Sequence, residues 1–121
     1  GFLGDTWARG GRTPVAPLYP IGYTAVVELI KHERFAVWLA ELRDPTARRK
    51  IVIRLRRLSL GNSGDARPVG HGVSELRIQW GPGYRVYFIR RGTQVIVILG
   101  GGTKSTQHQD IRDAQALTHD L

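Results

Sequence analysis

The sequence predicts one α+β domain, in which a small sheet made mostly of antiparallel strands packs against helices. Three observations support this class. Residues 72–88 contain two alternating apolar and polar segments that predict a β-hairpin. In residues 32–60 the apolar residues recur with the spacing of an α-helix, and residues 94–99 form a short apolar run. The expected element order is β-α-α-β-β-β-α. A chain of 121 residues is long enough to bury a substantial core.

The first 22 residues have no hydrophobic period and contain five glycines and three prolines. We therefore expect a flexible N-terminal extension over residues 1–22, followed by a folded domain over residues 23–121. Residues 23–30 (YTAVVELI) are largely apolar and rich in β-branched side chains. This composition predicts the first strand of the sheet.

Two consecutive helices are predicted next, over 32–43 and from Pro45 to Leu60. Asp44 can accept a hydrogen bond as the N-cap, and Pro45 suits the first helical position. Gly61 suits the C-terminal end. The residues expected to face the core are Phe35, Trp38, Leu39 and Leu42 in the first helix and Ala47, Ile51, Leu55 and Leu58 in the second.

Residues 62–72 are predicted to form a loop, because turn-forming residues dominate them. In the hairpin that follows, matching the apolar alternation of the two strands requires a three-residue turn, which pairs Trp80 with Tyr84. The apolar side chains then share one face. The other face carries Arg77, Gln79, Arg85 and Tyr87, a set that suits a polyanion.

The last predicted strand, residues 94–99, is apolar on both faces, which indicates a central strand covered on both sides. Residues 100–102 are three glycines and are interpreted as the turn from this strand to a final helix. Thr103 or Ser105 can cap that helix. Its inward positions are Ile111, Ala114 and Leu117.

The chain is strongly basic, with a formal net charge of +8 and a pI near 10.8. Arginine binds phosphate bidentately, so a nucleic-acid partner is favoured over an anionic membrane or an acidic protein. The chain has no cysteine, which excludes disulfides and thiolate metal sites. No transmembrane run and no signal-peptide core are visible. We therefore expect a cytoplasmic protein with no membrane partner.

Several basic residues are candidates for phosphate contacts. Lys50, Arg54 and Arg57 share one face of the second helix, which is either a solvated face or a phosphate-binding one. Lys104 follows the last strand and can meet Arg77 and Arg85 on one surface. The glycines before Lys104 lack the spacing of a nucleotide-binding P-loop.

Candidates for proton transfer are fewer. His108, near the start of the final helix, is either a general acid or base or a surface histidine. Glu75 shares the face of Arg77 and is either a base or an ion-pair partner. The four histidines have no metal-ligand spacing, so no metal or other cofactor is expected.

Residues 23–118 resemble the RelE/ParE superfamily of type II toxins, and within it the HigB-like addiction module killer group. The resemblance is carried by two long ordered patterns, GNxGDxxPVGxGVSELRIxxGPGYRVYF and GGxKxxQxxDI. The predicted element order matches the fold that this resemblance implies, a RelE-like sheet packed against helices.

The resemblance implies a growth-arresting toxin that a cognate antitoxin, a small helix-turn-helix protein from the same operon, keeps inactive. Many members are ribosome-dependent endoribonucleases that cut mRNA without a metal. There, the ribose 2′-hydroxyl attacks the adjacent phosphate and protein cations stabilise the transition state. The implied catalytic residues here are Arg85, Lys104 and Arg77, with His108 in place of a C-terminal tyrosine that this chain lacks. Candidate RNA-binding residues are Lys50, Arg54, Arg57, Tyr87 and Gln79.

A second function stays open at this point. ParE-type members share the fold but inhibit DNA gyrase without nuclease activity. The cluster of Arg77, Arg85 and Lys104 favours the ribonuclease, whereas the missing C-terminal tyrosine favours the gyrase inhibitor. Ribosome and mRNA are the expected targets in the first case, and gyrase in the second.

Overall fold

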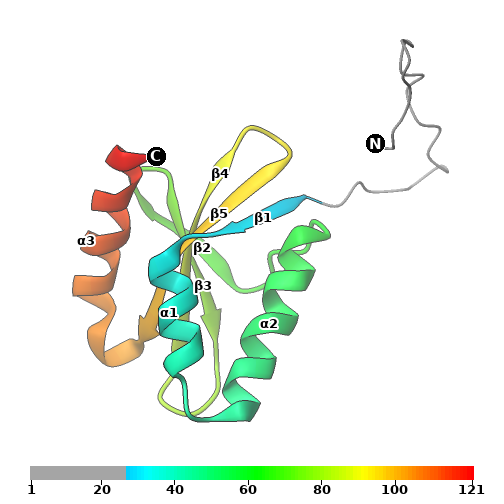
Figure 1. Ribbon diagram of the computed structural model, residues 1–121, viewed down its shortest axis with the longest axis vertical. Helices are drawn as coiled ribbons and strands as arrows, with labels where there is room; N and C mark the ends of the chain where they lie inside the picture. Colours follow the sequence, from blue (N-terminus) through cyan, green and yellow to red (C-terminus); the bar gives the residue numbers. More distant parts are fainter. Residues whose placement is uncertain (1–26) are drawn as a thin grey trace, which may run out of the picture.

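The computed structural model describes residues 27–121, which fold as a five-stranded mixed sheet with three α-helices (Figure 1). The elements in chain order are β1 (Glu28–Lys31), α1 (Glu33–Glu41), α2 (Pro45–Ser59), β2 (Ala66–Gly70), β3 (Val73–Ile78), β4 (Tyr84–Arg91), β5 (Val95–Thr103) and α3 (Gln107–Leu117). Short 3-10 helices flank α3 at Lys104–Thr106 and Thr118–Asp120. The predicted extension, 1–22, and the start of the predicted first strand, 23–26, lie outside the described residues.

The strand order is β1-β5-β4-β3-β2. β1 pairs with β5 in parallel, and the remaining neighbours are antiparallel. The predicted α+β class, with a mostly antiparallel sheet, is confirmed. The sheet has one strand more than the predicted order allows.

The additional strand is β2, so the prediction of a continuous loop over 62–72 is wrong. β2 lies at the sheet edge and pairs with β3, with an irregularity between Pro68 and Gly70. An edge strand tolerates Pro68 because one side of its backbone needs no ladder partner. Beyond the strand, His71 has a φ of 57° between two positive-φ glycines. This segment therefore contains both an edge strand and a tight turn. Because turn-forming residues occur in both, composition alone did not reveal the strand.

The two predicted helices are confirmed, as is the predicted N-cap of the second, whereas the N-cap of the first was not predicted. The His32 side chain accepts a hydrogen bond from the Arg34 amide at the start of α1. Asp44 Oδ1 accepts from the Thr46 amide at 2.9 Å, and Pro45 begins α2. The buried apolar residues are Phe35 of α1 and Ala47, Ile51, Leu55 and Leu58 of α2, all predicted to face inward.

Helices cover both faces of the sheet. On one face, α1 and α2 pack over a core that includes Ile96 and Ile98 of β5. On the other, α3 packs over Val97 and Leu99, and its Ile111, Ala114 and Leu117 face inward as predicted. β5 is therefore an interior strand covered on both faces, as its apolar sequence predicts. Figure 1 shows α2 and α3 on opposite sides of the strands.

An ion pair joins the helices of the two layers. Arg34 of α1 contacts Asp113 of α3 at 2.8 Å. Among the helices of 27–121, none combines the length and the hydrophobicity needed to cross a membrane.

The glycine run at 100–102 belongs to β5, so its interpretation as a turn is wrong. A Cβ at Gly101 would overlap the ring of Trp38 on α1, and a Cβ at Gly102 would overlap the carboxylate of Asp110 on α3. Glycine at these positions lets helices from both layers approach the strand closely. The turn to the final helix begins later, with the 3-10 helix that contains Lys104.

Candidate functional site

The connection between β3 and β4 determines which side chains reach the surface. Ile78 pairs with Tyr84 and Arg77 with Arg85, so residues 79–83 form a five-residue connection. The predicted three-residue turn and its pairing of Trp80 with Tyr84 are wrong by two residues. Because the shift is an even number, Arg77 and Arg85 still share one face of the sheet, as predicted.

A groove of about 550 Å³ opens at this end of the hairpin. Its lining residues are Arg77, Ile78, Gln79, Trp80, Gly81, Pro82, Gly83, Arg85 and Lys104. Lys104 reaches the groove because Tyr84 pairs with Thr103 and the Lys104 amide donates to the Gly83 carbonyl at 2.8 Å. The structure thus brings together the three predicted cations and Gln79.

Arg77 is held at the groove by Asp65. Its Nε and one terminal nitrogen lie 3.1 and 2.7 Å from the same carboxylate oxygen, Oδ1. These hydrogen bonds hold the pKa of Asp65 below its usual value. Both side chains are about one-third exposed, so the pair is weakened by solvent. Arg77 therefore has a fixed position and a partly compensated charge.

Arg85 is the most buried cation of the groove, with 12% of its side chain exposed. Its Nε is buried, makes no hydrogen bond to any described residue, and lies 3.8 Å from Glu75 Oε2. Glu75 is fully buried and lies between two guanidinium groups, because Arg67 contacts its other oxygen at 3.3 Å. One carboxylate between two arginines leaves this cluster with a net positive charge. Of these two arginines, only Arg85 lines the groove.

Tyr87 is not part of the accessible surface, so its predicted role in RNA binding is wrong. It is 1% exposed beneath α3, and its hydroxyl donates to Glu75 at 3.3 Å. Burial and the neighbouring carboxylate raise the pKa of this phenol well above its usual value. Gln107, at the start of α3, donates to the same Glu75 oxygen at 2.8 Å. Glu75 is thus an ion-pair and hydrogen-bond partner within a buried network.

His108 lies on the exposed side of the first turn of α3 and does not line the groove. Its role in proton transfer stays a prediction. In residues 27–121, no three histidine or carboxylate side chains group as metal ligands would.

The basic row on α2 adjoins the groove. Lys50, Ile53, Arg54 and Arg57 line a second hollow of about 280 Å³, together with Ile78 and Gln79 of the first. The predicted catalytic and RNA-binding residues, apart from Tyr87 and His108, therefore form one continuous surface.

Arg54 has a structural contact within this surface. Its side chain donates to the Arg77 carbonyl at 2.7 Å and to the Ser63 carbonyl at 3.4 Å. Partial burial lowers its pKa. Lys50 and Arg57 are exposed, so they are better placed than Arg54 for phosphate contacts.

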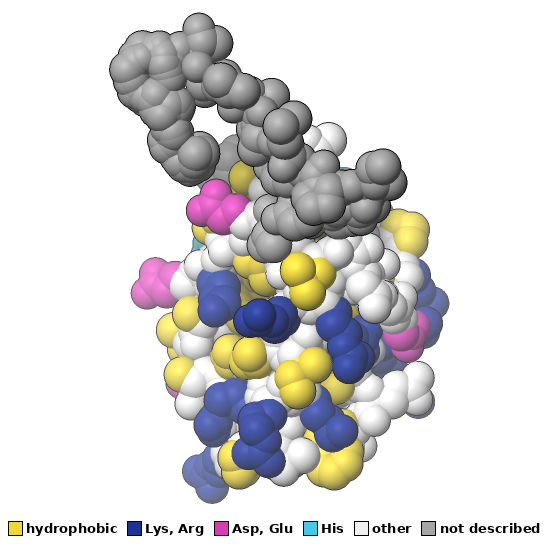
Figure 2. Space-filling model, turned by 90° about the vertical axis from the view of Figure 1, so that its right-hand side faces the viewer, with side chains coloured by type: hydrophobic (Ala, Val, Ile, Leu, Met, Phe, Trp, Pro, Cys, Tyr) yellow, Lys and Arg dark blue, Asp and Glu magenta, His cyan; other side chains and the backbone are white. Residues whose placement is uncertain are grey.

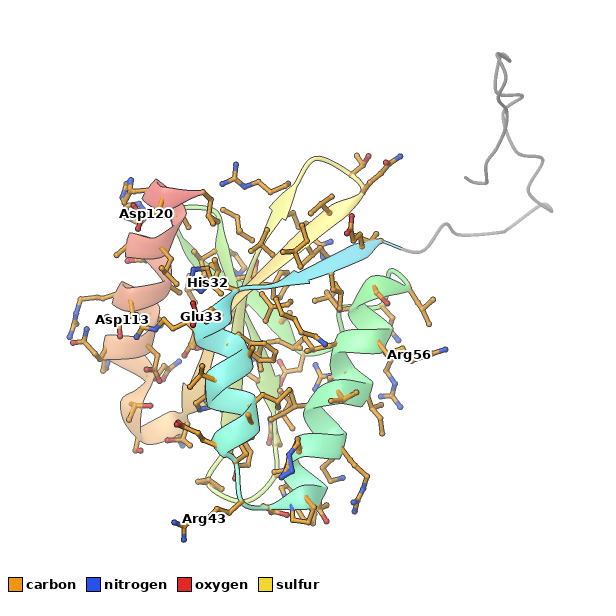
Figure 3. The ribbon with its side chains drawn as sticks, viewed as in Figure 1. His32, Glu33, Arg43, Arg56, Asp113 and Asp120 are labelled. Carbon is orange, nitrogen blue, oxygen red and sulfur yellow. The ribbon has the colours of Figure 1, made fainter. Side chains whose placement is uncertain are left out.

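Two features of the surface were missed by sequence reasoning. Trp80, assigned to the apolar face, leaves the sheet and lines the groove. Val52 and Ile53 of α2 are about half exposed among arginines. Figure 2 shows this side of the molecule, with hydrophobic side chains scattered among dark blue Lys and Arg, and Figure 3 shows Arg56 of α2 pointing away from the sheet. The Gly-Pro-Gly after Trp80 was the available signal for an early end to the strand.

No family model matches the chain. The chain is 44% identical over 87 residues to a protein of Haemophilus influenzae described as an uncharacterized protein. The matched region covers 72% of this chain and 88% of that protein. Identity at this level over most of both sequences shows common ancestry and a common fold. The chain therefore belongs to the same family as this Haemophilus influenzae protein.

Proposed function

We propose that this protein is the toxin of a type II toxin-antitoxin system, a RelE-like endoribonuclease that cuts ribosome-bound mRNA in the cytoplasm without a metal. The observation that carries the proposal is the convergence of Arg77, Arg85 and Lys104 on one groove. These residues come from three separate parts of the chain. The family-like patterns cover β3, β4, the end of β5 and the start of α3, which are the elements that build the groove. The observed order, with two helices before the main antiparallel strands, is compatible with a RelE-like topology.

The proposed reaction is an internal phosphoryl transfer. The ribose 2′-oxygen attacks the adjacent phosphorus, a 2′,3′-cyclic phosphate forms, and the bond to the 5′-oxygen breaks. Negative charge builds on the phosphate oxygens in the transition state, and fixed cations stabilise it. Arg85 is suited to this role because its partly buried guanidinium is shielded from solvent and held near Glu75.

The 2′-hydroxyl must lose a proton and the 5′-oxygen must gain one. Arginine keeps its proton, so Lys104 is the groove-lining residue that can exchange one. We therefore assign the proton given to the 5′-oxygen to the Lys104 ammonium rather than to His108, while water accepts the proton of the 2′-hydroxyl and returns one to Lys104. Lys104→Met should abolish cleavage, whereas His108→Ala should retain it. Retained cleavage in the first variant with loss in the second would reverse this assignment.

Primer extension on mRNA from cells that express the protein tests the proposal. Cuts should appear inside coding regions and disappear from a reporter whose start codon is removed, because cleavage requires translation. Arg91→Ala, an exposed arginine at the other end of β4, is the matched control for Arg85→Ala. Intact transcripts in growth-arrested cells would contradict the ribonuclease.

A gyrase inhibitor of the ParE type is the second candidate. It is favoured by the groove lining, which contains no histidine, aspartate or glutamate. An inhibitor needs no acid or base. Induction of the SOS response together with intact transcripts would support this function.

The proposed antitoxin partner has a candidate surface on α2. Val52 and Ile53, each about half exposed, line a shallow hollow of about 410 Å³ with Pro45, Arg48 and Arg49. α2 contains no acidic residue. An amphipathic segment with acidic flanks complements such a face. Val52 does not line the hollow of Lys50 and Arg57. Val52→Glu should therefore prevent rescue by the antitoxin while growth arrest persists, and continued rescue would place the antitoxin elsewhere.

A further inference from the structure

We infer that Trp80 is a stacking platform for an unpaired nucleobase of the strand whose phosphate lies in the groove. This inference rests on the proposed function, because it requires the groove to bind single-stranded RNA. It adds a base-binding position to a site whose other residues recognise phosphate.

The Trp80 side chain is both exposed and fixed. It is 39% exposed in the connection between β3 and β4. Its Nε1 donates to Asp44 Oδ2 at 3.0 Å, and Asp44 is itself anchored as the N-cap of α2. Lys50 Nζ lies 4.7 Å from the ring centroid. These contacts restrict the indole orientation while leaving a large apolar surface in water, an arrangement that costs hydrophobic free energy.

The position of the ring relative to the cations suits a nucleotide. Trp80 lines the groove with Arg77, Arg85 and Lys104, whereas Lys50 does not. The indole is therefore the aromatic wall of a hollow whose charged lining residues are all positive. Proteins that bind single-stranded nucleic acid combine these two components, since cations follow the backbone and aromatic rings stack on bases. Stacking accepts any base, so the ligand class is an unpaired base of a single strand.

The test compares two short oligonucleotides of equal length at low salt, a single-stranded RNA and a chain of the same sugar-phosphate units without bases. Fluorescence anisotropy of a terminal label gives each affinity. Stacking on one aromatic side chain contributes about 1–3 kcal/mol, which corresponds to roughly 5- to 150-fold in affinity. Trp80→Leu should therefore bind the RNA roughly 5- to 150-fold more weakly than the wild type does, and it should bind the abasic chain as tightly as the wild type does. Trp80→Phe should restore part of the RNA affinity.

The outcomes separate this inference from the proposed function. Arg85→Ala should weaken both oligonucleotides, because it removes a phosphate contact. If Trp80→Leu weakens the binding of both oligonucleotides equally, or of neither, the stacking role is wrong. The phosphate-binding role of the groove is then unaffected. If the wild-type protein binds neither oligonucleotide, both the phosphate-binding groove and the stacking role are wrong, and primer extension tests the proposed function separately. If Trp80→Leu leaves RNA binding unchanged but abolishes binding of the antitoxin, the residue contacts a protein instead.

Discussion

The two ends of one sheet face differ in what covers them. Glu75 on β3 and Tyr87 on β4 are paired and buried beneath α3. The next pair on the same face, Arg77 and Arg85, lines an open groove. Strand alternation is the same at both ends, so it cannot distinguish them. The position of α3 decides which polar side chains form a buried network and which form a candidate site.

The boundary between the two ends lies at Glu75. Its carboxylate accepts hydrogen bonds from Tyr87 and Gln107 on the covered side and lies 3.8 Å from Arg85 on the open side. The buried network thus supports the groove. If this distinction is correct, substitutions at the open end will change activity and those at the covered end will change stability.

The largest expected effect is at the open end. Arg85→Ala removes the most buried cation of the groove, and losing one such donor typically costs roughly 100- to 1000-fold in rate. Single-turnover cleavage of mRNA in a translation reaction measures the loss. The fold should persist, since Glu75 keeps Arg67 at 3.3 Å. Cleavage by folded Arg85→Ala at the rate of the Arg91→Ala control would remove Arg85 from the site.

At the boundary, Glu75→Ala should be strongly destabilising. It leaves Arg85 and the Tyr87 hydroxyl without their buried partner, and breaking a buried ion pair costs about 3–5 kcal/mol. Tyr87→Phe removes one hydrogen bond and should cost only about 1 kcal/mol. Urea unfolding gives both free energies of unfolding. Equal stability of Glu75→Ala and the wild type would show that the network does not hold the covered end.

A smaller effect is expected on the adjoining α2 surface. Replacing Lys50 and Arg57 with Gln removes two exposed cations and spares Arg54, whose contacts are structural. Single-strand affinity depends on salt with a slope of about −0.7 for each phosphate contact, so the slope should fall in magnitude by roughly 1.4. Affinity titrations at several salt concentrations measure it. An unchanged slope would exclude this part of α2 from RNA binding.

The smallest expected effect is a pH dependence at the covered end. Burial raises the pKa of Tyr87 above the usual 10.0. A raised folded-state pKa gives stability that is complete below the unfolded pKa and decreases as the pH rises above it. The stability of the wild-type protein should therefore fall above about pH 10, and the stability of Tyr87→Phe should fall less over the same pH range. Thermal unfolding between pH 9 and pH 11 compares the two proteins, and parallel curves would contradict the prediction.

Local sequence patterns predicted the elements well where contacts between residues close in sequence determine the structure. Asp44 and Pro45 begin α2 as their side chains dictate, and the positions of both helices that were predicted to face inward lie in the core or pack against it. That Arg77 and Arg85 share one face was also predicted from the strand alternation. A register shift by an even number of residues leaves each side chain on the same face of the sheet.

The misplaced features depend on tertiary contacts. Trp80 leaves the sheet and is held there by Asp44, which is 36 residues away in sequence. The glycines of β5 permit close approach of α1 and α3, which a local pattern cannot show. Tyr87 is buried because α3 covers it. The groove was therefore predictable as a set of cations, whereas its extent and its aromatic wall were not.

Growth of cells that express Arg85→Ala or Tyr87→Phe, at matched levels of folded protein, tests the central distinction most directly. These residues are two positions apart on one face of β4, one in the groove and one beneath α3. We predict that Arg85→Ala permits growth and that Tyr87→Phe arrests it as the wild type does. Growth arrest by Arg85→Ala together with growth of the Tyr87→Phe strain would contradict this account.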